Sequence, residues 1–224
     1  MASEVKTNKV SPSTGVTVTL GDASDVFQLP ASAEIDIASG ATLDVNGTID
    51  VTGATVTGLT TGKVLQVLQS VKTDTATTTV SGTTFADITG TDQAGAGSIW
   101  CVKITPAATN SKILVSWEMS VGAANNMGVI TKIQRDSVDI LLGDTAGSRI
   151  RVSAQTTTAY NYGMAGNSMM YLDSPSTTSE VEYKVVWSQQ HSSGDLYLNR
   201  TQMDPDNTGY HRATSTITVM EIGA

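Results

Sequence analysis

Apolar and polar residues alternate along many short stretches of this chain, and a period of two predicts β-strands rather than helices. The clearest example is 113–121, where Ile113, Val115 and Trp117 alternate with smaller or polar residues. The other strands predicted after residue 63 are 99–104, 129–133, 138–142, 168–172, 181–188, 196–198 and 214–222. The strands at 129–133 and 138–142 could form a hairpin across residues 135–137. Residues 63–71 suit either a strand or a turn of helix. Strands at this spacing, with turn residues between them, indicate a β-sandwich or jelly roll over residues 63–224.

Residues 31–62 carry a shorter apolar repeat. Leu43 and Val45 are followed six residues later by Ile49 and Val51. A six-residue period is typical of β-helical repeats, but about three units are few for one chain to stack alone. Three parallel copies around one axis could instead face these four residues inward. The pattern therefore predicts a short intertwined β shaft in a homotrimer, with a Thr/Gly linker as the alternative.

Residues 1–30 are polar, with one strand-like run at 15–20 and a short apolar patch that ends at Pro30. They hold too few apolar residues for a core, so we expect this segment to be mobile unless a partner binds it. Residues 1–10 lack the apolar centre of a signal peptide. No stretch of the chain approaches the roughly 18 apolar residues of a membrane span, so we expect no membrane insertion.

The composition narrows the class of protein further. The formal charge is −8, and the chain has no cluster of Lys and Arg, which argues against a nucleic-acid partner. Charged residues make up only 15% of the chain, where a cytosolic enzyme has about a quarter. This low fraction suits a β protein that buries surface against copies of itself. Cys101 is the only cysteine, which excludes an intrachain disulfide framework, and its apolar strand predicts a buried, inert thiol.

Few residues suggest catalysis. The two histidines, His191 and His211, fall in predicted loops, and no Gly-x-Ser-x-Gly motif accompanies them. Asp204 and Asp206 flank Pro205 in a segment of turn composition. A calcium site and a pair of glycoside-hydrolysing carboxylates are the alternatives for these two aspartates. We expect no catalytic site, no cofactor and no metal.

The aromatic residues divide into two groups. The three tryptophans lie on predicted strands with apolar neighbours, which predicts core packing. Tyr160, Tyr162 and Tyr210 lie in polar loops, the last beside His211. Exposed rings with hydrogen-bonding neighbours suit the recognition of sugars or protein surfaces. These four residues are the candidate receptor-binding site, and packing between subunits is the alternative for the tyrosines.

Several runs of residues resemble fibre proteins of tailed bacteriophages, especially marine ones. In the first 62 residues the matching runs are 11–22, Phe27 with Leu29–Pro30, and 40–58. Later in the chain they are 104–106, 111–115, 143–144, 147–149, 172–175, 183–185, 197–200 and 215–221. The resemblance implies a homotrimeric virion protein whose N-terminus attaches to the particle and whose C-terminal β jelly roll points outward. The shaft is much shorter than that of a long tail fibre.

The sequence thus predicts an all-β, non-enzymatic phage fibre protein with three parts. Residues 1–30 contact other virion proteins, 31–62 form the shaft, and 63–224 form the head that binds a glycan or protein on the host surface. A capsid decoration or head-fibre protein without a receptor is the alternative. A small depolymerase that uses Asp204 and Asp206 is a third possibility. The expected location is the virion, after synthesis in the bacterial cytoplasm.

Overall fold

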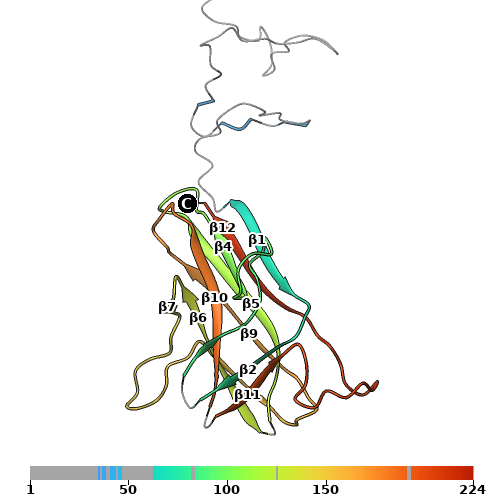
Figure 1. The fold of residues 1–224 in the computed structure, drawn as a ribbon. Coiled ribbons are helices and arrows are strands. Elements are labelled where there is room, and N and C mark those ends of the chain that lie inside the picture. The colour runs from blue at the N-terminus through green and yellow to red at the C-terminus, as the bar shows by residue number, and fades with distance from the viewer. Residues whose placement is uncertain are drawn as a thin grey trace, which may run out of the picture. The chain divides into compact units, whose positions relative to one another are not determined.

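The computed structural model describes residues 35, 37–38, 41–43, 45–46, 63–81, 84–124, 126–190 and 193–223 (Figure 1). Contacts between residues divide the chain into two units, Met1–Thr57 and Gly58–Ala224. The proposed virion-binding segment, Ile49 and Val51 lie outside the described residues. Leu43 and Val45 are exposed and lie outside any strand. The trimeric shaft therefore stays a prediction.

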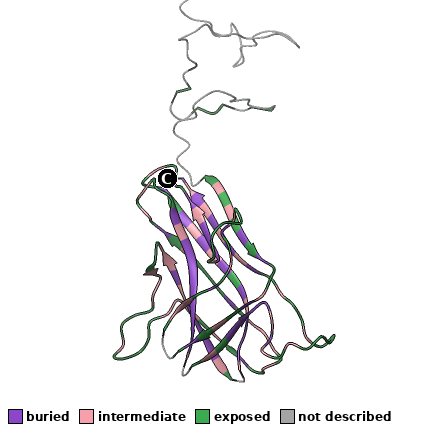
Figure 2. Cartoon of the chain, in the orientation of Figure 1, coloured by how far each residue is buried: buried purple, intermediate pink, exposed green. Residues whose placement is uncertain are grey.

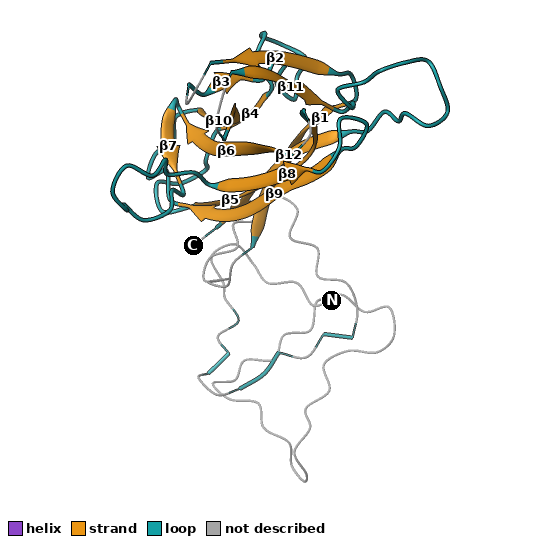
Figure 3. Ribbon diagram, turned by 90° about the horizontal axis from the view of Figure 1, so that it is seen from below, coloured by secondary structure: helices purple, strands orange, loops and turns teal. Residues whose placement is uncertain are grey.

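The described part of the second unit consists of strands and loops, with no helix, as the alternation predicted (Figure 3). The strands are β1 (Val64–Lys72), β2 (Ala76–Val80), β3 (Ala86–Asp87), β4 (Cys101–Ile104), β5 (Lys112–Gly122), β6 (Met127–Arg135), β7 (Val138–Ile140), β8 (Ala154–Thr158), β9 (Ala165–Asp173), β10 (Val181–Gln189), β11 (Gly194–Leu198) and β12 (Ser215–Ile222). Residues 63–71, for which the sequence allowed either a strand or a turn of helix, lie mostly in strand β1. Strands β2, β3 and β8 were not predicted. Among the described residues, none belongs to a helix that could cross a membrane.

The strands form two six-stranded antiparallel sheets, here called sheet A and sheet B. In sheet A, β1 pairs with β12, β12 with β5, and β5 with the edge strand β9. Strands β11 and β2 extend this sheet beyond one end of β12, where β11 pairs with β5. In sheet B, β10 lies at the centre between β6 and the short strands β4 and β3. Strands β7 and β8 both pair with the other edge of β6.

The inner faces of the two sheets share one apolar core, which Figure 2 shows as buried segments along the central strands. Trp117 on β5, Trp187 on β10 and Trp100 just before β4 are all at most 1% exposed. These are the three tryptophans that the sequence placed in the core. Alternation along β5 and β10 points their large side chains toward the opposite sheet, where burial removes apolar surface from water.

The β6–β7 hairpin forms where the sequence predicted it. Arg135 pairs with Val138 across a two-residue turn, as predicted for residues 135–137. Asp136 and Ser137 both have positive φ angles, 47° and 67°. Two positive φ angles are the geometry that matches a turn to the right-handed twist of a hairpin. The Asp136 carboxylate accepts a hydrogen bond from the backbone N–H of Glu182, which ties the turn to β10.

Strand register defines the two ends of the second unit. At one end, the backbone N–H of Gly223 donates a hydrogen bond to the carbonyl of Lys63 at 2.9 Å, so the residue before β1 meets the residue after β12. At the other end, Val121 of β5 pairs with both Ala165 and Leu198. Figure 1 shows β2 and β11 at this second end, away from the C-terminus. Lys112 of β5 pairs with Ile222 at the first end, and the nine residue steps from Lys112 to Val121 correspond to about 30 Å.

The buried carboxylate of Glu221 lies near the end of the sandwich where Gly223 contacts Lys63. Glu221 on β12 accepts hydrogen bonds from Gln66 Nε2 at 2.6 Å and from the backbone N–H of Ala107 at 2.7 Å. Burial raises the pKa of the Glu221 carboxyl, but the hydrogen bonds that it accepts, among them those from Gln66 and Ala107, outweigh burial and hold this pKa below the ordinary value of 4.5. Glu221 thus joins β12 to β1 and to the β4–β5 connection.

We expect acid to destabilise the sandwich partly through Glu221. A carboxylate whose pKa is lowered by folding stabilises the protein above its unfolded-state pKa, and this contribution is lost as pH falls through the folded-state pKa. Glu221→Gln should lower the free energy of unfolding by about 1 to 2 kcal/mol at pH 7. It should also reduce the stability lost between pH 7 and pH 3, measured by urea unfolding. Glu118→Gln, at an exposed position on β5, is the control. An unchanged pH dependence in Glu221→Gln would contradict this role.

Candidate functional site

Two loops meet at the end of the sandwich opposite Lys63 and Gly223. Residues 159–164 connect β8 to β9, and residues 199–214 connect β11 to β12. The backbone N–H of Met203 in the second loop donates a hydrogen bond to the carbonyl of Asn161 in the first, at 3.0 Å. These loops hold all four residues of the candidate receptor-binding site. The structure therefore brings together two segments that are far apart in the sequence.

Tyr160 and Tyr162 form a stacked pair on the first loop. Their ring centroids are 5.1 Å apart and their planes differ by 7°. The backbone N–H of Gly163 donates to the carbonyl of Tyr160 at 3.1 Å, which closes a tight turn around Asn161 and Tyr162. The rings remain 56% and 54% exposed. A stacked pair on a closed turn is a preformed aromatic surface that loses little conformational entropy on binding.

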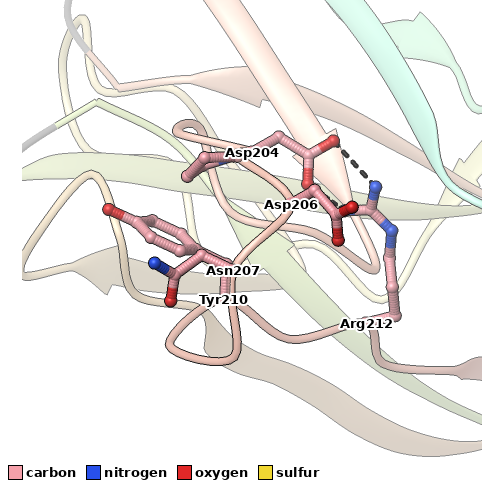
Figure 4. Close-up of a pocket in the computed structure, with 6 residues that line it drawn as sticks. Asp204, Asp206, Asn207, Tyr210 and Arg212 are labelled. Carbon is pink, nitrogen blue, oxygen red and sulfur yellow. Dashed lines mark hydrogen bonds and ion pairs between the residues drawn. The ribbon is translucent and has the colours of Figure 1, made fainter.

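Tyr210 lies on the second loop and lines an open cavity of about 290 Å³ (Figure 4). The lining residues are Asp204, Pro205, Asp206, Asn207, Tyr210 and Arg212. Asn207 shapes the turn, since its carbonyl accepts a hydrogen bond from the N–H of Tyr210 and its side-chain oxygen accepts one from the N–H of Gly209. His211 is exposed and does not line the cavity. The cavity thus places one aromatic ring beside carboxylate, amide and guanidinium groups.

Two arginines hold the Asp204 carboxylate. Arg212 donates to both carboxylate oxygens, one of these bonds being 2.8 Å long, and Arg200 donates at 3.1 Å. The hydrogen bond from Arg212 is the largest cause of a lowered pKa of Asp204; partial burial opposes it, and the charge of Arg200 adds to it. Arg200 also lies 4.7 Å from the centroid of the Tyr197 ring. This ion-pair network fixes the fold of the second loop around the cavity.

Asn199 closes the base of the same loop. It is fully buried, with a positive φ of 60°. Its side-chain amide donates to the carbonyls of Lys72 and Asp74 at 2.8 and 2.9 Å, and its side-chain oxygen accepts from Ser215 Oγ at 2.6 Å. Its own carbonyl accepts from the N–H of Ala213 at 3.1 Å. The two ends of the loop are therefore tied together and to the β1–β2 connection.

The structure also bears on three other residues considered in the sequence analysis, which are Asp204, Cys101 and His191. Because Asp204 is paired with two guanidinium groups, it is poorly placed to act as a nucleophile or proton donor, or to bind a cation. Within the described residues, no three His, Cys, Asp or Glu side chains are grouped as a metal site would require. Cys101 is buried as predicted, and burial with the nearby Glu182 raises the pKa of its thiol to about 12. His191 lies outside the described residues.

Sequence reasoning missed the residues that organise the site. Asn199, Arg200 and Arg212 carry no motif. The side chain of Asn199 bonds to residues outside this loop, at Lys72, Asp74 and Ser215, whereas both arginines pair with Asp204 of their own loop. The spacing of Arg200 and Asp204 suggests an ion pair only if the loop geometry is already known. A further hollow of about 430 Å³ lies over sheet B, beside Ile130, Arg149, Ile150 and Gln190. No pattern in the sequence predicted this hollow.

The loop end of the sandwich therefore offers exposed aromatic rings, a polar cavity and hydrogen-bonded loops, a combination that suits the binding of a ligand. Comparison with known proteins assigns no family: no protein-family model and no curated protein matches this chain.

Proposed function

We propose that the chain is a non-enzymatic, trimeric bacteriophage fibre protein that attaches the virion to its host. Residues 1–30 bind other virion proteins, 31–62 form a short intertwined β shaft, and 63–224 form the head. The resemblance of many short runs to phage fibres supports this assignment. So does the all-β architecture with a low fraction of charged residues.

The strand order supports a jelly roll for the head. Eight strands taken in chain order, β1, β4, β5, β6, β8, β9, β10 and β12, fall into two four-stranded layers. One layer has the order β1-β12-β5-β9 and the other has β4-β10-β6-β8. The first and last strands are neighbours, and most connections cross between the layers, as in a double Greek key. Strands β2, β3, β7 and β11 are additions to this frame.

The position of the aromatic loops carries the proposal. They lie at the end of the head opposite Lys63, where the preceding residues join it. A chain held to the virion through residues 1–30 then presents Tyr160, Tyr162 and Tyr210 at its far end. Tyrosine faces stack on sugar rings, while Asp206, Asn207 and Arg212 offer hydrogen bonds to hydroxyl groups. Three weak sites on one trimer act together, which raises the overall affinity.

We expect Tyr160→Ala with Tyr210→Ala to reduce adsorption of the purified full-length protein to host cells by about tenfold or more. The molar mass of the protein should stay unchanged in light scattering. Val138→Ala, which removes an exposed apolar side chain on β7, is the control and should adsorb normally. Tyr160→Phe should retain most of the binding, because it keeps the stacked ring.

Normal adsorption of the double variant would remove these tyrosines from the site. A wild-type protein that binds no host cells and localises to the capsid surface would favour the capsid-decoration function instead.

A further inference from the structure

The outer face of sheet A carries an apolar row that crosses four strands. The register aligns Val67 of β1 with Met220 of β12, Met220 with Leu114 of β5, and Leu114 with Leu172 of β9. Val67 and Leu172, on the outermost strands, are 52% and 51% exposed. Further exposed apolar side chains border this row: Val64, Leu65 and Met170. We call these seven residues the sheet A patch.

Charged residues are scarce around the patch. On the outward-facing positions of β5, the charged side chains are Lys112 at one end and Glu118 toward the other. The outer face of sheet B differs, because its central outward-facing side chains are already buried within the chain. Lys184, Val186 and Ile130 are at most 6% exposed. Lys184 also pairs with Asp87 at 2.8 Å, and Lys132 pairs with Asp139 at 2.7 Å. Among the described residues of the sheet B strands, Val138 is the large apolar side chain that stays exposed, whereas the sheet A patch has several and has the low charge of an interface centre.

The sheet A patch also lies where the preceding chain joins the head. Val64 and Leu65 directly follow Lys63, and Val64 pairs with Ile222 near the C-terminus. The 62 residues before this point carry the repeat that predicts three intertwined copies. Three chains that leave a common axis at residue 62 bring their β1 strands close to that axis. The outward side chains of β1 are then the first residues of each head to meet another copy.

We infer that the sheet A patch is the surface through which the heads of three copies of this chain associate around the trimer axis. The inference rests on the trimer of the proposed function and specifies which face of the head forms it. Each copy turns sheet A inward and sheet B outward. Burial of the row removes Val67, Met220, Leu114 and Leu172 from water. The aromatic loops remain accessible, because they lie at the end of the sandwich rather than on this face.

Charge substitution tests the inference in the full-length protein. Val67→Glu with Leu172→Glu places a carboxylate on each side of the row, at positions exposed enough for the single head to tolerate it. Val138→Glu is the matched control, since Val138 is 61% exposed on β7 of sheet B. We expect the double variant to dissociate from trimer to monomer at a protein concentration about tenfold or more above that of the wild type. The Val138→Glu protein should behave as the wild type in light scattering.

Cross-linking provides a second measurement that does not depend on destabilisation. Cys101 is buried, so an introduced cysteine is the reactive thiol of the chain. Val67→Cys treated with a short bismaleimide should give covalent dimers on a denaturing gel, and Val138→Cys should not.

Two results together would contradict this interface while leaving the trimer of the proposed function intact. The wild type would be a trimer whose mass does not change with Val67→Glu and Leu172→Glu, and Val67→Cys would not cross-link. A wild-type monomer would instead remove the trimer of the proposed function, and this interface with it.

Discussion

Asp173→Asn should lower the free energy of unfolding of the sandwich by about 3 kcal/mol. Asp173 lies on β9 of sheet A, is 4% exposed, and reaches across to two residues of sheet B. It accepts hydrogen bonds from Arg135 Nη1 at 2.8 and 3.0 Å and from Tyr183 Oη at 2.7 Å. Burial, together with the nearby Asp173, raises the pKa of Tyr183, so the phenol stays protonated and donates. The asparagine would leave the Arg135 guanidinium without an anion in a largely buried position.

Urea unfolding measures this loss, and the slope of the transition should be unchanged if the fold is retained. In thermal unfolding the same loss corresponds to roughly 10 °C for a domain of this size. Asp195→Asn is the matched control, because Asp195 also accepts a hydrogen bond from a tyrosine, Tyr197, but is exposed. It should cost less than about 1 kcal/mol. Arg135→Met combined with Asp173→Leu should recover part of the loss, since no buried charge then remains unpaired. Equal effects of the two Asp→Asn substitutions would contradict a special role of Asp173.

Asn199→Ala should destabilise the sandwich by about 3 kcal/mol and loosen the loop that holds Tyr210. Alanine would remove two donors to the carbonyls of Lys72 and Asp74 and the acceptor of Ser215 Oγ. It would also occupy a backbone conformation with φ of 60°, which asparagine tolerates better than alanine. Chemical unfolding measures the stability, and hydrogen exchange of residues 200–213 measures the loosening.

Asn207→Ala is the control for Asn199→Ala. Asn207 also makes turn hydrogen bonds in the same loop, but it is exposed, and its loss should cost well under half as much. If both variants unfolded at the same urea concentration, the clamp at the base of the loop would not be the main support of the site.

Local sequence patterns predicted the strands that carry strong alternation. Residues 113–121 became β5 because apolar side chains two residues apart must share one face of a strand. The turn at residues 135–137 became a hairpin because its two central residues adopt positive φ angles. Strands β2 and β8 were missed because their threonine-rich runs, such as Ala76–Val80, show no apolar period. Each is defined by pairing with a distant strand, β2 with β11 and β8 with β6.

By itself, the sequence determined an all-β domain with its tryptophans in the core and with Tyr160 and Tyr162 exposed in a polar loop. Tyr210, also predicted to be exposed, is half-buried. These are local properties, set by side-chain period, burial preference and turn composition. Only the tertiary structure decided that the 159–164 and 199–214 loops meet, that Asp204 is held by two arginines, and that Asp173 joins the two sheets. It also aligned Val67, Leu114 and Leu172 in one exposed row. The meeting of the loops, the contacts of Asp173 and the exposed row depend on strand register between segments far apart in the chain, and no local pattern encodes that register alone. The pairs of Asp204 form within one loop, but they depend on how that loop folds.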